Sequence, residues 1–181
     1  YDIYIANVCA NSISDYIGPI TVTTNCQDRT IPFLETFDNY NSQVNNFNGC
    51  WTHNSNANYR TDYCETYSPG NNFVGMASRA LWMGSNNSYY YYLSMPHVSM
   101  PLNRLMLRFK MARHIQGNAG NATKLYVGVM SDPEDISTFD TLMLVDMTSD
   151  SRYRVREYEM RFIDYGINDG YVTFFVPKMN Q

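Results

Sequence analysis

The sequence predicts an all-β protein built as a β-sandwich. Short stretches of alternating apolar and polar side chains are separated by polar turn residues, and no convincing long helical repeat intervenes. Aromatic residues, which favour strands, make up 15% of the 181 residues, whereas only 17% are charged. Asn, Ser, Thr and Tyr therefore supply much of the surface, and these residues favour strands and turns. A chain of this length can bury one well-formed core.

Two strands are expected first, at residues 1–9 and 20–24, with a polar loop between them. An isolated hairpin is marginally stable in water, so its partner strands should lie upstream or in the next domain. The pattern resembles the last two strands of a fibronectin type III domain, with Tyr1 at the position of the tyrosine corner. Residues 1–24 are therefore assigned to the end of such a domain, and residues 25–30 to a linker. The alternative is a hairpin that belongs to the main domain.

The main domain is expected to cover residues 31–181. Phe33 and Phe37 lie at helical spacing, but the asparagines that follow favour turns, so residues 33–38 are predicted as a short strand before a loop. A strand with a buried Trp51 should follow, and residues 54–75 are then expected to be mostly loop. Further strands are expected at residues 80–83, 89–95, 103–114, 124–130, 142–147, 154–162 and 171–176.

Residues 124–139 organise this domain. Leu125, Val127 and Val129 alternate with outward positions, as a strand with one core face requires. The strand breaks at Ser131, and an acidic stretch with Asp132, Glu134 and Asp135 follows. The stretch lacks the glycine and the twelve-residue spacing of an EF-hand loop, so it is predicted to be a turn and not a calcium site.

Four cysteines, Cys9, Cys26, Cys50 and Cys64, occur without the paired spacing of a zinc site. Two local disulfides, Cys9–Cys26 and Cys50–Cys64, are the simplest of the three connectivities and would indicate an oxidising compartment. Cys50 and His53 also have the spacing of a thiol beside a base, but an oxidised sulfur cannot attack a substrate.

Charge and motif content exclude several classes of function. The net charge of −4 argues against binding nucleic acid or anionic membrane through a general basic field. No apolar run reaches membrane-spanning length. The three histidines are scattered, and Glu157 and Glu159 lie among arginines as expected for a solvated ionic face. The sequence therefore predicts no catalytic site.

A tyrosine run at residues 89–92 is the clearest candidate contact surface. The run puts two tyrosines on each face of one strand, so one pair should be core. The other pair, Tyr90 and Tyr92, is predicted to be exposed, together with loops at residues 54–67, and such rings suit stacking on sugars or contact with protein. A second sheet or a loop over that face would remove this surface. Trp51 and Trp82 are expected in the core.

Several motifs then agree in order with one family. Residues 31–38 resemble the Pro-Phe-x-Glu-x-Phe-Glu opening of MAM-like jelly-roll modules on Bacteroidetes surface proteins, including cleaved-adhesin domains of gingipain and haemagglutinin type. The Val-Gly-Val-Met-Ser-Asp-Pro run at residues 127–133 is similar to the most distinctive segment of that family. The resemblance covers about residues 31–181. It implies a jelly-roll sandwich of the MAM or concanavalin type, often preceded by a fibronectin type III domain.

The resemblance also implies particular sites. Glu35 and Asp38 would help to bind a structural Ca²⁺, for which carboxylate oxygens are suitable ligands. In the family an Asp-Asp pair on a final strand completes this site. Here that strand is expected to be missing, and Thr36 replaces the usual acid. The Asp140-Thr141-Leu142 pattern resembles bacterial O-glycosylation sites of the family, which would place a glycan on Thr141.

The function expected from the resemblance is a non-catalytic adhesion module of a secreted or cell-surface bacterial protein. Its partners would be host protein or glycan and the neighbouring domains of a longer polypeptide, because the chain begins abruptly at Tyr1 within a strand pattern. Two alternatives remain open: a structural spacer in a multidomain surface protein, and an accessory domain of a secreted protease or glycosidase.

Overall fold

Strands are the main secondary structure of the described part of the chain, as the sequence predicts. The computed structural model describes residues 2–9, 12–21, 26–38, 50–55, 64–67, 80–83, 89–113 and 124–178. The helical segments described there are short 3-10 turns, namely η2 (Leu102–Arg104), η4 (Ile136–Thr138) and η5 (Phe162–Tyr165). Among these residues no helix has the length and apolar character needed to cross a membrane.

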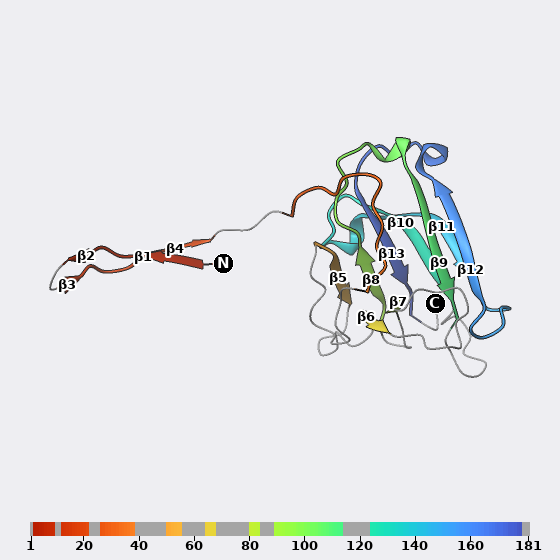
Figure 1. Ribbon diagram of the computed structural model, residues 1–181, viewed down its shortest axis with the longest axis horizontal. Helices are drawn as coiled ribbons and strands as arrows, with labels where there is room; N and C mark the ends of the chain where they lie inside the picture. Colours follow the sequence, from red (N-terminus) through yellow and green to blue (C-terminus); the bar gives the residue numbers. More distant parts are fainter. Residues whose placement is uncertain are drawn as a thin grey trace.

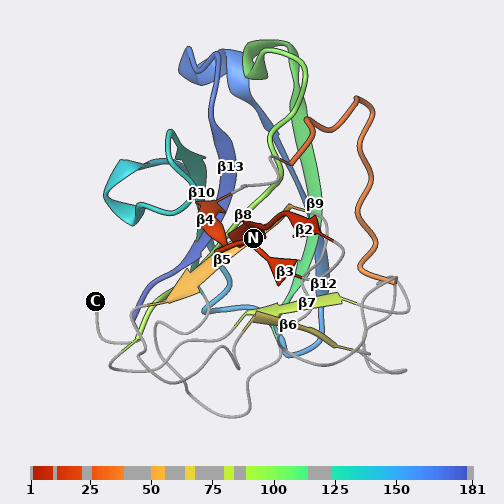
Figure 2. The same cartoon turned by 90° about the vertical axis from the view of Figure 1, so that its left-hand side faces the viewer.

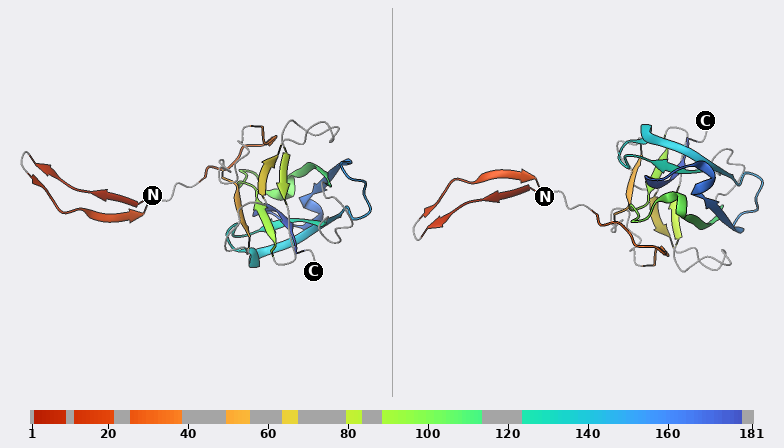
Figure 3. Two further views of the ribbon diagram at one scale, coloured as in Figure 1. Left: turned by 90° about the horizontal axis from the view of Figure 1, so that it is seen from below. Right: turned by 90° about the horizontal axis from the view of Figure 1, so that it is seen from above.

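The first strands form a hairpin that stands apart from the other strands (Figures 1 and 3). Strand β1 (Asp2–Ile5) pairs antiparallel with β4 (Ile17–Thr21), and β2 (Val8–Cys9) pairs with β3 (Ser12–Ile13) near the tip. The hairpin itself confirms the expected strand pairing, although β3 lies in the segment predicted as loop. Several of its large apolar side chains are more than half exposed, namely Tyr4, Ile5, Val8, Ile13, Tyr16 and Ile17.

A five-stranded antiparallel sheet is the largest element of the molecule. Its strand order is β11-β10-β13-β8-β5, so neighbours in the sheet are often distant in the chain. The strands are β5 (Thr52–Ser55), β8 (Tyr91–Ser94), β10 (Lys124–Met130), β11 (Phe139–Asp146) and β13 (Tyr171–Val176). The central strand β13 joins β10 to β8, which places residues 91–94 beside a strand about 80 positions later in the chain.

A second layer packs against this sheet. Strands β9 (Met106–Ala112) and β12 (Val155–Arg161) form an antiparallel ribbon, and β6 (Cys64–Tyr67) pairs with β7 (Ala80–Met83). Figure 2 shows the ribbon and the five-stranded sheet as separate layers, with β6 and β7 at one end. Strand β6 lies within residues 54–75, which were predicted to be mostly loop.

The main core lies between these two layers. Leu125, Val127 and Val129 of β10 are buried in it, as predicted, beside apolar residues of β13. From the opposite layer come Leu107, Phe109 and Met111 of β9, whose side chains are less exposed than those of Met106, Arg108 and Lys110 between them. The period-2 alternation of both strands is therefore explained by one shared core, which makes the domain sandwich-like.

A smaller core surrounds Trp51, which is 7% exposed and confirms the prediction of a buried tryptophan. Phe33, Phe37 and Leu93 pack in the same cluster. Residues 33–38, however, contain no strand, so that prediction is wrong. Phe37 has a left-handed backbone (φ 61°), which interrupts extended structure and turns its ring to within 5.7 Å of the Trp51 ring.

Candidate functional site

The tyrosine strand is buried on both faces. Tyr91 and Tyr92 are each 2% exposed, so the prediction that Tyr92 contributes to an exposed contact surface is corrected. The hydroxyl of Tyr92 donates a hydrogen bond to the backbone carbonyl of Glu134 at 3.2 Å. Glu134 belongs to the acidic turn after β10, so this turn covers the face that was expected to be open.

The acidic turn holds itself together through its own side chains. The Asp132 carboxylate accepts the Glu134 N–H at 2.9 Å, and the Asp135 carboxylate accepts the Ser137 N–H at 2.9 Å. The hydrogen bonds from Ser137 hold the pKa of Asp135 below its usual value. The Thr138 hydroxyl donates to the carbonyls of Asp132 and Asp135. The prediction of a turn is confirmed, since these carboxylates cap backbone N–H groups.

Tyr90, unlike Tyr92, is half-buried, and it belongs to a group of partly exposed aromatic side chains around Phe175. Its ring lies 5.6 Å from the ring of Phe175 on β13, and the rings of Tyr126 and Phe139 lie 6.0 Å and 5.5 Å from the same ring. All four side chains are partly exposed. We call Tyr90, Tyr126, Phe139 and Phe175 the Phe175 cluster. The sequence contained one signal for it, because Tyr126 alternates with the core residues of β10 and must point away from the core.

Glu35 and Asp38 lie in a strained turn at the start of the main domain. The Phe37 N–H donates to Glu35 Oε1 at 2.7 Å, and Asp38 is exposed. Within the described ranges, no group of three or more His, Cys, Asp or Glu side chains could hold a metal ion. Two carboxylates do not make a calcium site. The described residues therefore supply two candidate ligands, and calcium binding stays a prediction.

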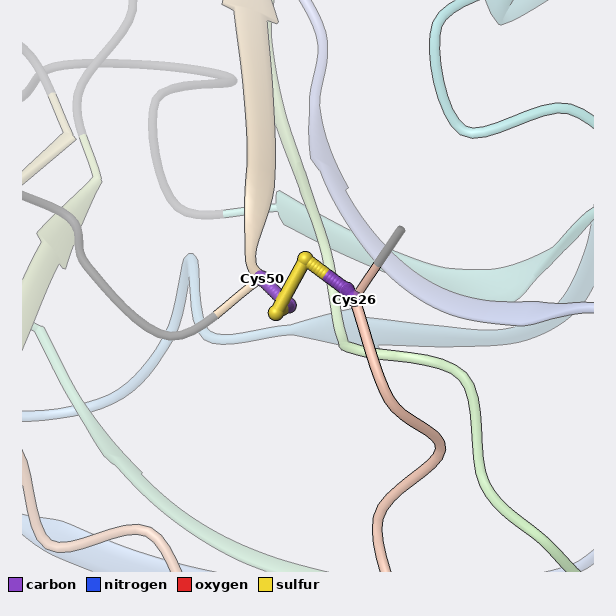
Figure 4. Close-up of a disulfide and its surroundings, with 2 residues drawn as sticks. All are labelled: Cys26 and Cys50. Carbon is purple, nitrogen blue, oxygen red and sulfur yellow. A yellow bond between two sulfur atoms is a disulfide. The ribbon is translucent and has the colours of Figure 1, made fainter. Parts of the chain in front are cut away.

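The disulfide of the described part differs from the predicted pairing. Cys26 is bonded to Cys50, with their Cα atoms 5.5 Å apart, so the predicted Cys9–Cys26 and Cys50–Cys64 pairs are corrected (Figure 4). The fold places the start of the linker beside the residues that lead into β5, which sequence distance does not reveal. The side chains of Cys9 and Cys64 lie outside the described part of the structure. Cys50 is oxidised, so it cannot act as a thiol nucleophile beside His53.

His97 lies between two carboxylates, an arrangement that sequence reasoning missed. His97 Nδ1 is 2.9 Å from Asp28 Oδ1, and His97 Nε2 is 2.9 Å from Asp169 Oδ1. The hydrogen bond with Asp169 and then that with Asp28 raise the pKa of His97, and partial burial opposes them. The three residues come from the linker, the segment after β8 and the turn before β13, so only the fold brings them together.

Comparison with known proteins leaves the family open. No family model matches this chain, and neither a curated protein nor a solved structure matches it. The resemblance to MAM-like modules therefore remains a prediction from the motifs.

The structure also describes two other positions that the sequence singled out, Glu159 and Thr141. Glu159 forms ion pairs with Arg108 at 2.9 Å and with Arg161 at 3.7 Å, which confirms an ionic face on the β9–β12 ribbon. Thr141 is exposed on β11, an edge strand of the five-stranded sheet. The Trp82 side chain and residues 56–63 of the predicted contact loops lie outside the described residues.

Proposed function

We propose that this protein is a non-catalytic binding module that acts outside the cell. Its partner is a protein or a glycan that presents flat apolar surface with polar edges. The Phe175 cluster carries this proposal, and it replaces the Tyr90 and Tyr92 pair suggested by the sequence.

The Phe175 cluster has properties that suit recognition. Three partly exposed rings contact one central ring, with centroids 5.5–6.0 Å apart, which is the usual range for aromatic pairs. Rings held against one another lose little freedom on binding, and two tyrosines add hydroxyl groups at the edge. Pyranose rings and apolar side chains both bind such surfaces.

Two further observations fit an extracellular module that holds calcium, whereas its jelly-roll topology of the MAM-like type is proposed from the sequence motifs. The Cys26–Cys50 disulfide suits an oxidising compartment such as a bacterial cell surface. The turn at residues 35–38 places two carboxylates near the Trp51 core, and bound Ca²⁺ would neutralise their charge. Further oxygen ligands would have to come from outside the described residues.

A binding screen tests the proposal. The intact protein would be applied to a glycan array and to a panel of extracellular-matrix proteins, with added CaCl₂ and with EDTA. The variants Y90A and Y126A should lose binding, whereas Y165A, which removes an exposed tyrosine of η5 outside the cluster, should keep it. Absence of binding by the unaltered protein under both conditions would overturn the proposal.

The alternative of a structural spacer is favoured by a different observation. The linker is attached to the sandwich by the Cys26–Cys50 disulfide and by backbone hydrogen bonds of Arg29, which would limit bending between the hairpin and the main domain. A protein that binds no partner but keeps this attachment would fit the spacer role.

A further inference from the structure

The linker is attached to the sandwich at a point where a histidine joins two acidic side chains. Arg29 forms a parallel bridge with Val98: its N–H donates to the His97 carbonyl at 2.8 Å, and its carbonyl accepts the Ser99 N–H at 3.0 Å. The adjacent Asp28 reaches the His97 ring from the linker side. Asp169 reaches the ring from the opposite side, in the turn that leads into β13.

The protonation state of His97 follows from its two carboxylate partners. An ionised carboxylate only accepts hydrogen bonds, so each ring nitrogen must carry a proton to bond with its own aspartate. The arrangement therefore requires the imidazolium cation. A neutral imidazole donates from one nitrogen only, and its other nitrogen would turn a lone pair toward a carboxylate oxygen.

Besides the two aspartates, the described residues next to His97 include Tyr171 and Arg29. The Tyr171 ring on β13 lies 5.3 Å from the His97 ring, measured between ring centroids. The Arg29 guanidinium lies over the Phe33 ring, 5.7 Å from its centroid. Two carboxylates and one imidazolium give the group a net charge of −1, which becomes −2 when His97 loses a proton. The loss of one proton thus removes a hydrogen bond and adds repulsion.

We propose that Asp28, His97 and Asp169 form a pH-dependent latch that fixes residues 26–30 to the sandwich while His97 is protonated. When His97 loses this proton, the two backbone hydrogen bonds of Arg29 break. Residues 27–30 then become more mobile. The Cys26–Cys50 disulfide keeps the chain tethered throughout. The latch therefore controls how rigidly residues 27–30 are held, because the disulfide at Cys26 fixes the chain on the hairpin side of the latch in both states.

The pKa shifts of His97 and Asp169 determine how the stability of the latch depends on pH. Because folding raises the pKa of His97, its contribution to stability is complete below about pH 6.5 and is lost as the pH rises through the raised value. Folding lowers the pKa of Asp169, chiefly through its hydrogen bond with His97, so that contribution is lost only as the pH falls through the lowered value, below about pH 4. The latch is closed between these limits and opens on the alkaline side.

Amide hydrogen exchange measured by NMR tests the latch. Protection factors of the Arg29 and Ser99 amides would be measured from pH 5.5 to pH 9 and normalised to intrinsic exchange, which removes base catalysis from the comparison. We expect the protection to fall several-fold on the alkaline side, with a limit of about tenfold for each unit by which the pKa is raised. Amides of β9 and β12 serve as the internal reference and should not change.

Two variants distinguish opening of the latch from a loss of amide protection throughout the protein at high pH. H97Q should show low protection of the Arg29 amide at every pH. D169N keeps an oxygen for the Gly170 N–H and changes a side chain that is 85% exposed, so it should fold and shift the transition to lower pH. Constant protection in the unaltered protein would overturn the proposal. So would a transition that persists in H97Q or does not move in D169N.

Discussion

At the scale of single residues, the backbone geometry of β10 depends on one position without a side chain. The pairing of β10 with β11 shifts register between Val127 and Gly128. A Cβ atom on Gly128 would lie 2.0 Å from the Asp140 carbonyl oxygen and 2.8 Å from the Phe139 ring. Both contacts are shorter than van der Waals distance, so glycine is needed for this close approach.

Substitution of this glycine tests the packing of the sheet. G128A should lower the free energy of unfolding by about 3 kcal/mol or more, because backbone must move to accept the methyl group. G166A is the matched control: its φ of +70° disfavours alanine by about 1–2 kcal/mol, but the site is open. Urea unfolding would measure both. Destabilisation of G128A no greater than that of G166A would contradict the close contact.

At the scale of elements, the acidic turn matters because it covers a strand. Ser94 and Thr173 share a hydrogen bond of 2.8 Å and are fully buried on the sheet face away from the main core. Met130 is buried beside them and leads into the turn. The turn is therefore a packing element of the sheet, as its hydrogen bond from Tyr92 indicates.

Removal of the Tyr92 hydroxyl measures the attachment of the turn. Y92F should destabilise the protein by about 0.5–1.5 kcal/mol, the net value of one hydrogen bond. Y165F, at an exposed tyrosine, should change stability by less than about 0.5 kcal/mol. Chemical unfolding compares the two variants, and equal stabilities would show that the turn does not depend on this bond.

The disulfide joins two elements that are 24 positions apart in the chain. Its loss in a C26S/C50S variant should cost about 3 kcal/mol, because the unfolded chain regains the freedom of the closed loop. Guanidinium unfolding of the variant and of the oxidised protein gives the difference. Peptide mapping by mass spectrometry should recover the Cys26–Cys50 link, and recovery of Cys9–Cys26 instead would contradict the structure.

At the scale of the whole molecule, the sandwich layers meet the linker near the Trp51 core and the turn at residues 35–38. This turn would be the calcium site of the proposed module. A ligand that binds only the folded state stabilises it in proportion to RT ln(1 + [L]/Kd), about 2.7 kcal/mol when the free ligand is a hundredfold above Kd. Stability of the module should therefore depend on calcium.

Chelation tests this dependence. EDTA should lower the Tm by several degrees, since a loss of 1–2 kcal/mol shifts a domain of this size by about that amount. The E35Q/D38N variant should have a lower Tm with calcium present and no further response to EDTA. An identical Tm with EDTA and with added calcium would remove calcium from the proposed function.

Much of the fold was readable from side-chain alternation alone. The period of two in β9, β10 and β13 depends only on strand geometry and one shared core, so a local pattern is sufficient to predict these strands. Trp51 was likewise predicted to be buried from its size and apolar character. The turn after β10 was predicted from the break of the strand at Ser131 and from the acidic residues that follow it.

Other features depend on contacts between distant parts of the chain. Tyr92 has the same local pattern whether its face is open or covered, and the turn that covers it lies 42 positions away. Cys26 bonds with Cys50 because the fold brings the linker to β5, and the predicted local pairs ignored that path. His97 meets aspartates 69 and 72 positions away. Such pairings follow from strand order and layer packing, which no local pattern contains.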